Sequence, residues 1–428
     1  MRKTGISFSQ YRYLIFAVLG SAYILVFFHR MAPAVVAIDI MADLQTSGAL
    51  MGILASAYFY PYGLMQIPAG LLSDSWGPRR SIALFFIIGA VGSILLGLAQ
   101  NTAMAILGRV LVGLGVAMVF IPTLKILTSW FERDKFVYMN GLLMTLGGVG
   151  AFSASTPLAL LSDAISWRGS MVAIGALTLV MSGLVWLIVR DTPEQSGFKP
   201  VNHLPAETGE GKKIKLFNGI GLVLTSRSFW PVAGCGFFGS LVTLSFAGLW
   251  GGPFLMHVYD MSKTQAGGVL SAMAIGMVVG APTMSWLANR VLCSRKKVLI
   301  LGQLCAFCVF IPLAFFTGDF SHTQLYVWCF AYNFFMSSLA VVGYSIIKDS
   351  FPLQISGTAT GTMNLFPFAG ALAGQPFIGW FLDYACSDGG PYTVNAYSAV
   401  FKICLLSLFL SVICALVVTE PVSRDASG

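Results

Sequence analysis

The sequence predicts an all-α polytopic membrane protein, with twelve transmembrane helices arranged as two pseudo-symmetric six-helix bundles. Three observations support this fold class. Of the 428 residues, 57% are hydrophobic and 10% are charged, with a mean hydropathy of +0.80, whereas a soluble domain carries about 25% charged residues. The apolar residues gather in twelve segments, each long enough to cross a bilayer. The two halves of the chain also repeat each other.

The twelve segments fall into two groups of six. In the first half they cover residues 13–40, 48–72, 79–99, 103–128, 137–161 and 168–190. In the second half they cover residues 229–257, 264–289, 297–317, 323–347, 357–382 and 396–418. The polar stretch between the groups is rich in Pro, Gly and Lys, which is typical of a linker. We therefore expect an N-terminal bundle in 1–190, a cytoplasmic linker in 191–227 and a C-terminal bundle in 228–428.

The charge distribution predicts the orientation. Cytoplasmic placement of both termini puts most of the 25 Lys and Arg residues on inner loops, leaving Arg168, Lys263 and Lys402 outside. The first apolar run closely follows Met1-Arg-Lys3 and lacks a small-residue cleavage site, so no cleavable signal peptide is expected. Compact loops favour a bacterial cytoplasmic membrane.

The composition also argues against several ligand classes. The net charge of +8 is spread over short loops, which does not indicate a nucleic-acid surface. Among the eight cysteines, Cys305 and Cys308 share a helix face, but no His or further Cys completes a metal site. We expect no metal, no cofactor and no nucleic acid as a partner, and we expect a monomer in the membrane.

Sequence repetition relates the two halves. Phe131, Gly141, Gly150 and Asp163 recur 220 residues later as Phe351, Gly361, Gly370 and Asp383. A period near half the chain length predicts two parallel repeats. In transporters built this way, the substrate lies near the midplane between repeats.

Arg30 is the residue that indicates function most directly. It lies in the first apolar segment, about 5 Å outward of the segment's midpoint at 1.5 Å per residue. A charge there costs roughly 2.5–3.5 kcal/mol, so it marks a functional site by default. Arginine does not escape this cost by losing its proton. The alternative is that Arg30 reaches the outer interface or closes a structural ion pair.

The loop between the second and third segments carries a motif. The stretch Gly70-Leu-Leu-Ser-Asp74-Ser-Trp-Gly77-Pro-Arg79-Arg80 resembles the cytoplasmic signature of the major facilitator superfamily. This resemblance extends over nearly the whole chain and implies the facilitator fold and secondary transport. It also implies a cytoplasmic gate formed by Gly70, Asp74, Gly77, Arg79 and Arg80, in which carboxylate and guanidinium groups form a breakable latch. The alternative is that the two arginines only fix orientation.

Two further stretches match this family. Gly108-Arg109-Val-Leu-Val-Gly113-Leu-Gly115 is similar to its arginine–glycine motif in helix 4, where the arginine either lines the cavity or bonds helix 1 backbone. The His29-Arg30 pair resembles the helix 1 motif of anion:cation symporters and, more loosely, of organophosphate exchangers. His29 stands where the symporters usually have aspartate. Residues 246–253 lack the second arginine of the exchangers, which demotes phosphate esters. Gly147-Gly148-Val-Gly150 lacks the glycine–proline of drug:proton antiporters, which disfavours multidrug export.

A guanidinium in a desolvated cavity selects anions, because its planar donors match carboxylate or phosphate. His29 is the candidate for proton coupling, since its ordinary pKa is near 6.5; a hydrogen-bonded bystander is the alternative. Lys125 is a candidate for receiving a released anion; the alternative is that its side chain only reaches the membrane interface. The candidate substrate-binding residues are Arg30, Tyr23, Arg109, Trp250, Tyr332, Asn333, Asn364, Tyr58, Tyr62 and Lys125.

The sequence therefore predicts a secondary active transporter and not an enzyme. We expect it to move a small organic anion or zwitterion, either a monocarboxylate or an amino acid-like molecule, by alternating access and proton-coupled uptake. The alternatives are a drug or metabolite efflux antiporter of the same fold and, from another class, a non-transporting membrane sensor.

Overall fold

The computed structural model describes residues 7–201, 216–386 and 391–420. Part of the expected linker, residues 202–215, lies outside the described residues. The chain divides into two compact units: Met1–Thr46 with Ile53–Glu210, and Ser47–Gly52 with Gly211–Gly428. No strand occurs among the described residues, so the fold is all-α as predicted.

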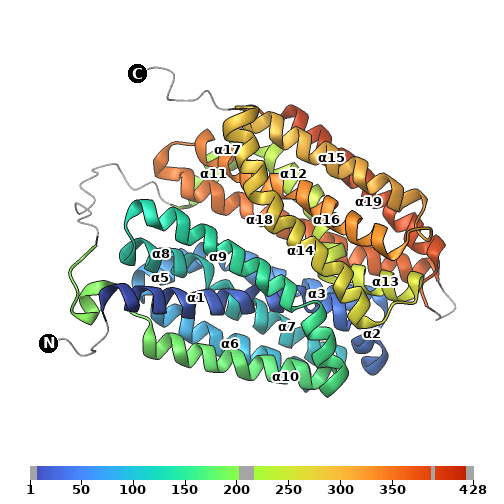
Figure 1. Ribbon diagram of the computed structural model, residues 1–428, viewed down its shortest axis with the longest axis horizontal. Coiled ribbons are helices and arrows are strands. Elements are labelled where there is room, and N and C mark those ends of the chain that lie inside the picture. Colours follow the sequence, from blue (N-terminus) through green and yellow to red (C-terminus); the bar gives the residue numbers. More distant parts are fainter. Residues whose placement is uncertain (1–6, 202–215, 387–390, 421–428) are drawn as a thin grey trace. The chain divides into compact units, whose positions relative to one another are not determined.

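The first unit begins with the broken helix pair α1 and α2 and ends in a short 3-10 turn. Its elements are α1 (Phe8–Met31), α2 (Pro33–Leu44), the last part of α3 (Gly48–Ser56), α4 (Phe59–Leu64), α5 (Gln66–Ser75), α6 (Pro78–Gly97), α7 (Thr102–Ala117), α8 (Phe120–Trp130), α9 (Arg133–Ser153), α10 (Thr156–Ile188) and η1 (Pro193–Ser196). The first residues of α3, up to Gly52, are grouped with the second unit. Within this unit α6 packs against both α7 and α10 (Figure 1).

The second unit contains three π-helical turns inside its long helices. Its elements are α11 (Leu216–Thr225), α12 (Phe229–Ser245), η2 (Phe246–Trp250), α13 (Gly251–Tyr259), α14 (Lys263–Trp286), η3 (Leu287–Val291), α15 (Arg295–Phe315), α16 (His322–Ser338), η4 (Leu339–Gly343), α17 (Tyr344–Ser350), α18 (Leu353–Ala385) and α19 (Val394–Val417). Here α12 packs against α18 and α19, and α14 against α16.

Ten helical stretches of the described chain are long and apolar enough to cross a membrane. Large apolar side chains such as Leu187, Leu406 and Val417 are exposed on their surfaces, as residues facing lipid would be. Of the twelve expected spans, residues 48–72 form three short helices instead of one. Residues 137–161 are covered by α9 and the first turn of α10.

Prolines break the first two expected spans. Residues 13–40 are interrupted at Ala32, because Pro33 has no N–H to donate to the carbonyl of His29. In residues 48–72 the helix stops after Ser56 and again at Met65, since Pro61 and Pro68 have no N–H to donate to the carbonyls four residues before them. The first two predicted spans are therefore segmented where candidate site residues lie.

Close contact between helices of the first unit depends on glycine. A Cβ at Gly113 would lie 2.1 Å from the carbonyl oxygen of Tyr58, and one at Gly115 would lie 2.3 Å from the nitrogen of Gly89. The glycines of the helix 4 motif therefore serve backbone approach, as small residues do between membrane helices.

Candidate functional site

Aromatic rings surround the guanidinium of Arg30. Arg30 lies in the last turn of α1 and is 8% exposed. Its Cζ lies 4.6 Å from the ring centre of Phe27, 4.9 Å from that of Tyr62 and 5.9 Å from that of Tyr58. Tyr58 and Tyr62 stack on each other at 5.5 Å. We call Arg30, Tyr23, Phe27, Tyr58 and Tyr62 the Arg30 cluster.

Helix geometry and a helix break assemble this cluster. Tyr23, Phe27 and Arg30 recur at spacings of four and three along α1, so they share one face. Tyr23 stacks on Phe120 at 5.6 Å and meets the edge of Phe27 at 5.3 Å. Tyr58 sits in the interruption between α3 and α4. Buried guanidinium groups gain from aromatic faces, by ~2 kcal/mol where desolvated, so the rings stabilise the charge at this depth.

Arg109 lies beside the cluster and bonds main-chain oxygens. Its Nη1 donates to the carbonyl of His29 at 2.7 Å, and its Nη2 donates to the carbonyl of Ala55 at 3.3 Å. Both carbonyls belong to the broken stretches of the first two spans. Its Cζ also lies 5.2 Å from the ring of Tyr58. These contacts favour the alternative in which Arg109 bonds helix backbone.

The His29 side chain contacts α10. Its Nε2 lies 3.1 Å from Oγ1 of Thr178, and that hydroxyl donates to the carbonyl of Ile174 at 2.8 Å. The hydroxyl therefore accepts from His29, which corresponds to the tautomer protonated on Nε2. His29 is 2% exposed, and its partner connects α1 to α10.

Lys125 contacts Asp74, one of the five residues of the expected cytoplasmic gate. Its Nζ lies 2.5 Å from Oδ1 of Asp74 and donates to the carbonyl of Ser73 at 3.0 Å. The side chains of Lys125 and Asp74 are 42% and 72% exposed. Asp74 thus has a partner in α8, whereas the motif had suggested a latch with the arginines of its own loop.

Arg79 of that loop contacts the end of α10. Arg79 donates from Nε to the carbonyl of Trp186 at 2.9 Å, and its Cζ lies 4.7 Å from the Trp186 ring. The carboxylate of Asp191 accepts from the backbone N–H of Arg79 at 2.7 Å. Arg80 is exposed. The motif did not predict the contacts of Arg79 with Trp186 and Asp191, because these residues lie 107 and 112 positions away from Arg79 in the sequence.

The two glycines of the motif differ in their surroundings. Gly77 has φ of +89°, and a Cβ there would lie 2.6 Å from Oδ2 of Asp191. A Cβ at Gly70 would meet nothing within 4 Å. Gly77 is therefore required by the turn in a way that Gly70 is not.

The amide candidates of the second unit bond neighbouring helices. Asn333 donates from Nδ2 to the carbonyl of Met273 at 2.7 Å, which ties α16 to α14. Asn364 accepts at Oδ1 from the hydroxyl of Tyr344 at 2.6 Å, which ties α18 to α17. Both residues thus make the helix–helix hydrogen bonds expected of buried amides.

The aromatic candidates of the second unit are also packed. The indole of Trp250 donates to the carbonyl of Gln375 at 2.9 Å. Tyr332 stacks on Trp328 at 5.3 Å with an interplanar angle of 2°, and its hydroxyl lies 3.0 Å from Oγ1 of Thr243. Trp250 and Tyr332 are almost fully buried.

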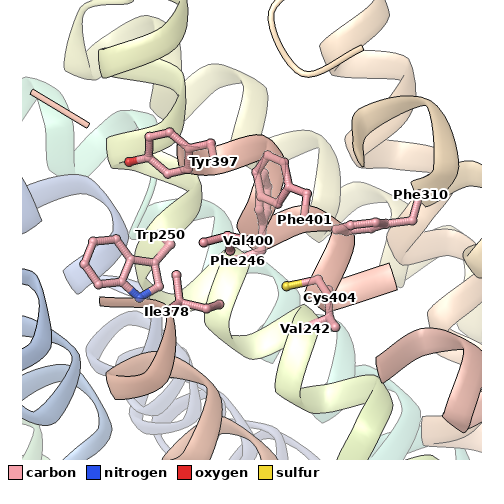
Figure 2. Close-up of a pocket in the computed structure, with 9 residues that line it drawn as sticks. All are labelled: Val242, Phe246, Trp250, Phe310, Ile378, Tyr397, Val400, Phe401 and Cys404. Carbon is pink, nitrogen blue, oxygen red and sulfur yellow. The ribbon is translucent and has the colours of Figure 1, made fainter. Parts of the chain in front are cut away.

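A pocket beside Trp250 is apolar. Figure 2 shows Trp250 and Ile378 on one side of it and aromatic rings on the other. The lining residues are Val242, Phe246, Trp250, Phe310, Ile378, Tyr397, Val400, Phe401 and Cys404. This lining carries no cationic group, so the pocket does not match the chemistry of an anion site.

Phe27 is the cluster member that sequence reasoning missed. An aromatic residue in an apolar span resembles any lipid-facing side chain. The available signal was its position three residues before Arg30, which places both side chains on one helix face.

Two helical units with lipid-facing apolar surfaces and a buried guanidinium cluster define an integral, multi-pass membrane protein of the carrier class. The chain belongs to the Major Facilitator Superfamily, whose family model matches residues 19–252 and 241–428. It is therefore a membrane transporter and not an enzyme, as the sequence motifs predicted.

Several curated relatives align over most of the chain. A probable hexose phosphate transport protein of Chlamydia pneumoniae is 24% identical over 394 residues, covering 86% of this chain and 85% of that protein. A probable galactarate/D-glucarate transporter of Escherichia coli K12 is 22% identical and covers 96% of both chains. A hexuronate transporter of Bacillus subtilis is 22% identical and covers 92% of this chain and 93% of its own.

Solved structures agree on the fold. A bacterial homolog of the human lysosomal transporter Spinster matches with a TM-score of 0.76 at 20% identity, covering 95% of this chain and 96% of its own. The nucleoside transporter NupG, solved as a point mutant, matches with a TM-score of 0.74 at 13% identity, covering 94% of this chain and 100% of its own. At these identities the likeness establishes the facilitator fold alone.

Proposed function

We propose that the chain is a secondary active transporter that imports a small organic monoanion, with Arg30 as the residue that binds its carboxylate. The single observation that carries the proposal is the Arg30 cluster, a guanidinium 8% exposed and faced by the rings of Phe27, Tyr58 and Tyr62. A permanent charge at membrane depth is a functional-site hypothesis by default, and a guanidinium binds carboxylate through two parallel N–H donors.

The number of buried guanidinium groups favours a single negative charge. Arg30 and Arg109 are the buried arginines of the described chain. Arg109 directs Nη1 and Nη2 to the carbonyls of His29 and Ala55. We assign the substrate to Arg30 because its guanidinium is faced by aromatic rings and lies at membrane depth. The relatives' names point to anionic cargo: a hexose phosphate, galactarate or D-glucarate, and a hexuronate. A sugar-acid monocarboxylate of the hexuronate kind fits one guanidinium best.

Transport would proceed by alternating access, with the loop between α5 and α6 as the cytoplasmic gate. We expect two contacts to break and reform: the ion pair of Lys125 with Asp74 and the hydrogen bond from Arg79 to the carbonyl of Trp186. Exposed ion pairs contribute about 0–1 kcal/mol, so this latch is weak enough to open in each cycle.

Proton coupling is assigned to His29 in this proposal. His29 directly precedes Arg30 in the sequence, and its side chain is buried and bonded to Thr178.

The asymmetry of Lys and Arg across the spans supports cytoplasmic termini in a bacterial cytoplasmic membrane. We propose that the carrier functions as a monomer.

Binding by purified protein tests the proposal. A thermal-shift panel of carboxylates, amino acids and phosphate esters, with glucuronate and glucose 6-phosphate included, is expected to show stabilisation by carboxylates. Arg30→Ala should remove that stabilisation, because the parallel N–H donors of the guanidinium are lost. Arg30→Lys keeps the positive charge but not the parallel N–H donors, so it should weaken carboxylate binding by about tenfold. An undiminished shift in Arg30→Ala would remove Arg30 from the binding role.

Vesicle orientation separates uptake from efflux. Labelled acid should accumulate in right-side-out vesicles when the outside is acidic. Accumulation only in inverted vesicles would favour the efflux antiporter of the same fold. Binding without either flux or counterflow would instead favour a sensor.

A further inference from the structure

Phe27 lies closer to the Arg30 guanidinium than the two tyrosines do. The distance from Cζ to its ring centre is 4.6 Å, against 4.9 Å for Tyr62 and 5.9 Å for Tyr58. Phe27 is three residues before Arg30 on the same face of α1, and its side chain is only half-buried. The ring is therefore positioned beside the charge and is partly exposed.

Gly147 in α9 provides the space for this ring. A Cβ at Gly147 would lie 2.9 Å from Cε2 and 3.0 Å from Cδ2 of Phe27, and 3.1 Å from Cε1 of Tyr23. Real Cβ atoms rarely approach ring carbons so closely, so any larger residue at 147 would displace both rings. Tyr23 supports Phe27 from a second side through an edge contact at 5.3 Å. The position of the Phe27 ring is thus set by α9 and by Tyr23.

The Cζ of Arg30 lies over the Phe27 ring, so an anion that binds the guanidinium must fit beside this ring. A carboxylate is planar and binds with both oxygens in the guanidinium plane. Phosphonate and sulfonate groups are tetrahedral, so their third oxygen leaves the plane of the other two and needs additional room near the ring. The geometry therefore penalises tetrahedral head groups, even where their charge equals that of a carboxylate.

We propose that Phe27, seated against Gly147, is a specificity-determining residue that makes the Arg30 site select a planar carboxylate over a tetrahedral anion. This inference rests on the proposed function, because it assigns the head group bound at Arg30. It also groups this chain with the relative named for a hexuronate rather than with the one named for a hexose phosphate.

The test compares propionate, ethanesulfonate and ethylphosphonate, which share an ethyl group and differ in the head. Their dissociation constants are measured on purified full-length protein by thermal shift. Ethanesulfonate is the informative competitor, since it carries one negative charge, as propionate does. In the wild-type protein propionate should bind about tenfold or more tighter than ethanesulfonate, a ratio typical of steric exclusion.

Phe27→Ala should reduce this ratio to about threefold or less, mainly by tighter binding of ethanesulfonate. Phe27→Tyr keeps the ring and should keep the ratio. Gly147→Ala should weaken propionate binding by displacing Phe27, whereas Gly141→Ala in the same helix is the matched control, since a Cβ there meets nothing within 4 Å.

Two outcomes are distinguishable. If Arg30→Ala leaves propionate binding unchanged, the proposed function fails. If propionate binding depends on Arg30 but the ratio is the same in Phe27→Ala and wild type, the selectivity role of Phe27 is wrong and the proposed function stands. Should Phe27→Ala not fold, Phe27→Leu removes the flat ring with less loss of volume and decides the same question.

Discussion

Arg109 donates a hydrogen bond to the main-chain oxygen of His29, 2.7 Å away, which is the oxygen that Pro33 leaves without a helical donor. A proline in a membrane span creates such an orphan carbonyl, and a neighbouring helix must satisfy it. Here α7 does so with a charged donor. The same guanidinium reaches Ala55 next to the second interruption, so one side chain stabilises both broken stretches from which the Arg30 cluster is built.

The first prediction concerns this support. Arg109→Ala should lower the free energy of unfolding by roughly 2–5 kcal/mol, because each buried carbonyl left without a donor costs ~1–3 kcal/mol. The loss can be measured as a fall in the thermal unfolding midpoint in detergent.

A double mutant tests the physical cause of that loss. Pro33→Ala returns an N–H to the carbonyl of His29, so Pro33→Ala with Arg109→Ala should be less destabilised than the sum of the single changes. Strict additivity would show that the His29 carbonyl does not need Arg109.

Some of this arrangement could be predicted from the sequence. Arg30 was predictable because a charge inside an apolar segment is costly wherever the helix faces. The spans were predictable because long apolar runs form a strong signal. Pro33 was visible too, but its consequence was not, since the donor that replaces its N–H lies 80 residues from His29, whose carbonyl accepts the bond.

Other members of the site leave little signal in a single sequence. Phe27 is one of 33 phenylalanines, and its spacing of three from Arg30 places it on the same helix face without showing the contact with α9. Asp74 was expected to bond the arginines of its own loop, yet the nearby cation is Lys125, which is 51 residues away. Asp191 lies 112 residues from Arg79, whose backbone it binds. Contacts of this kind depend on tertiary packing.

The second prediction concerns the gate pair. Asp74→Asn and Lys125→Gln should each slow uptake by a similar factor, and the double change should be no slower than either, because all three remove the same contact. Stability should change by less than about 1 kcal/mol, as for exposed pairs. The readout is the maximal uptake rate in proteoliposomes. Asp74→Lys with Lys125→Asp is expected to recover part of the rate, and failure of the reversed pair would assign Lys125 a separate role.

The third prediction separates the two interpretations of His29. His29→Gln places an amide donor near the position of Nε2, so the bond to Thr178 should persist. Exchange of labelled substrate against unlabelled substrate should continue, while accumulation driven by an inward proton gradient is lost, because glutamine does not titrate.

Thr178→Val is the control for packing, since it removes the hydrogen bond and keeps the histidine. Gradient-driven accumulation should survive in Thr178→Val. If His29→Gln accumulates substrate as well as wild type does, the histidine serves only the contact between α1 and α10.

The fourth prediction uses the two motif glycines as a matched pair. Gly77→Ala should destabilise the turn by roughly 1–3 kcal/mol, because a side chain at positive φ is strained and its Cβ would lie 2.6 Å from Oδ2 of Asp191. Gly70→Ala meets open space and should keep wild-type stability and uptake. Asp191→Ala removes the obstructing carboxylate, so Gly77→Ala in that background should lose less stability than in wild type, leaving only the backbone strain. Unfolding midpoints of the four variants check this, and an equal effect of alanine at 70 and 77 would mean that helix approach, rather than the turn, explains the motif.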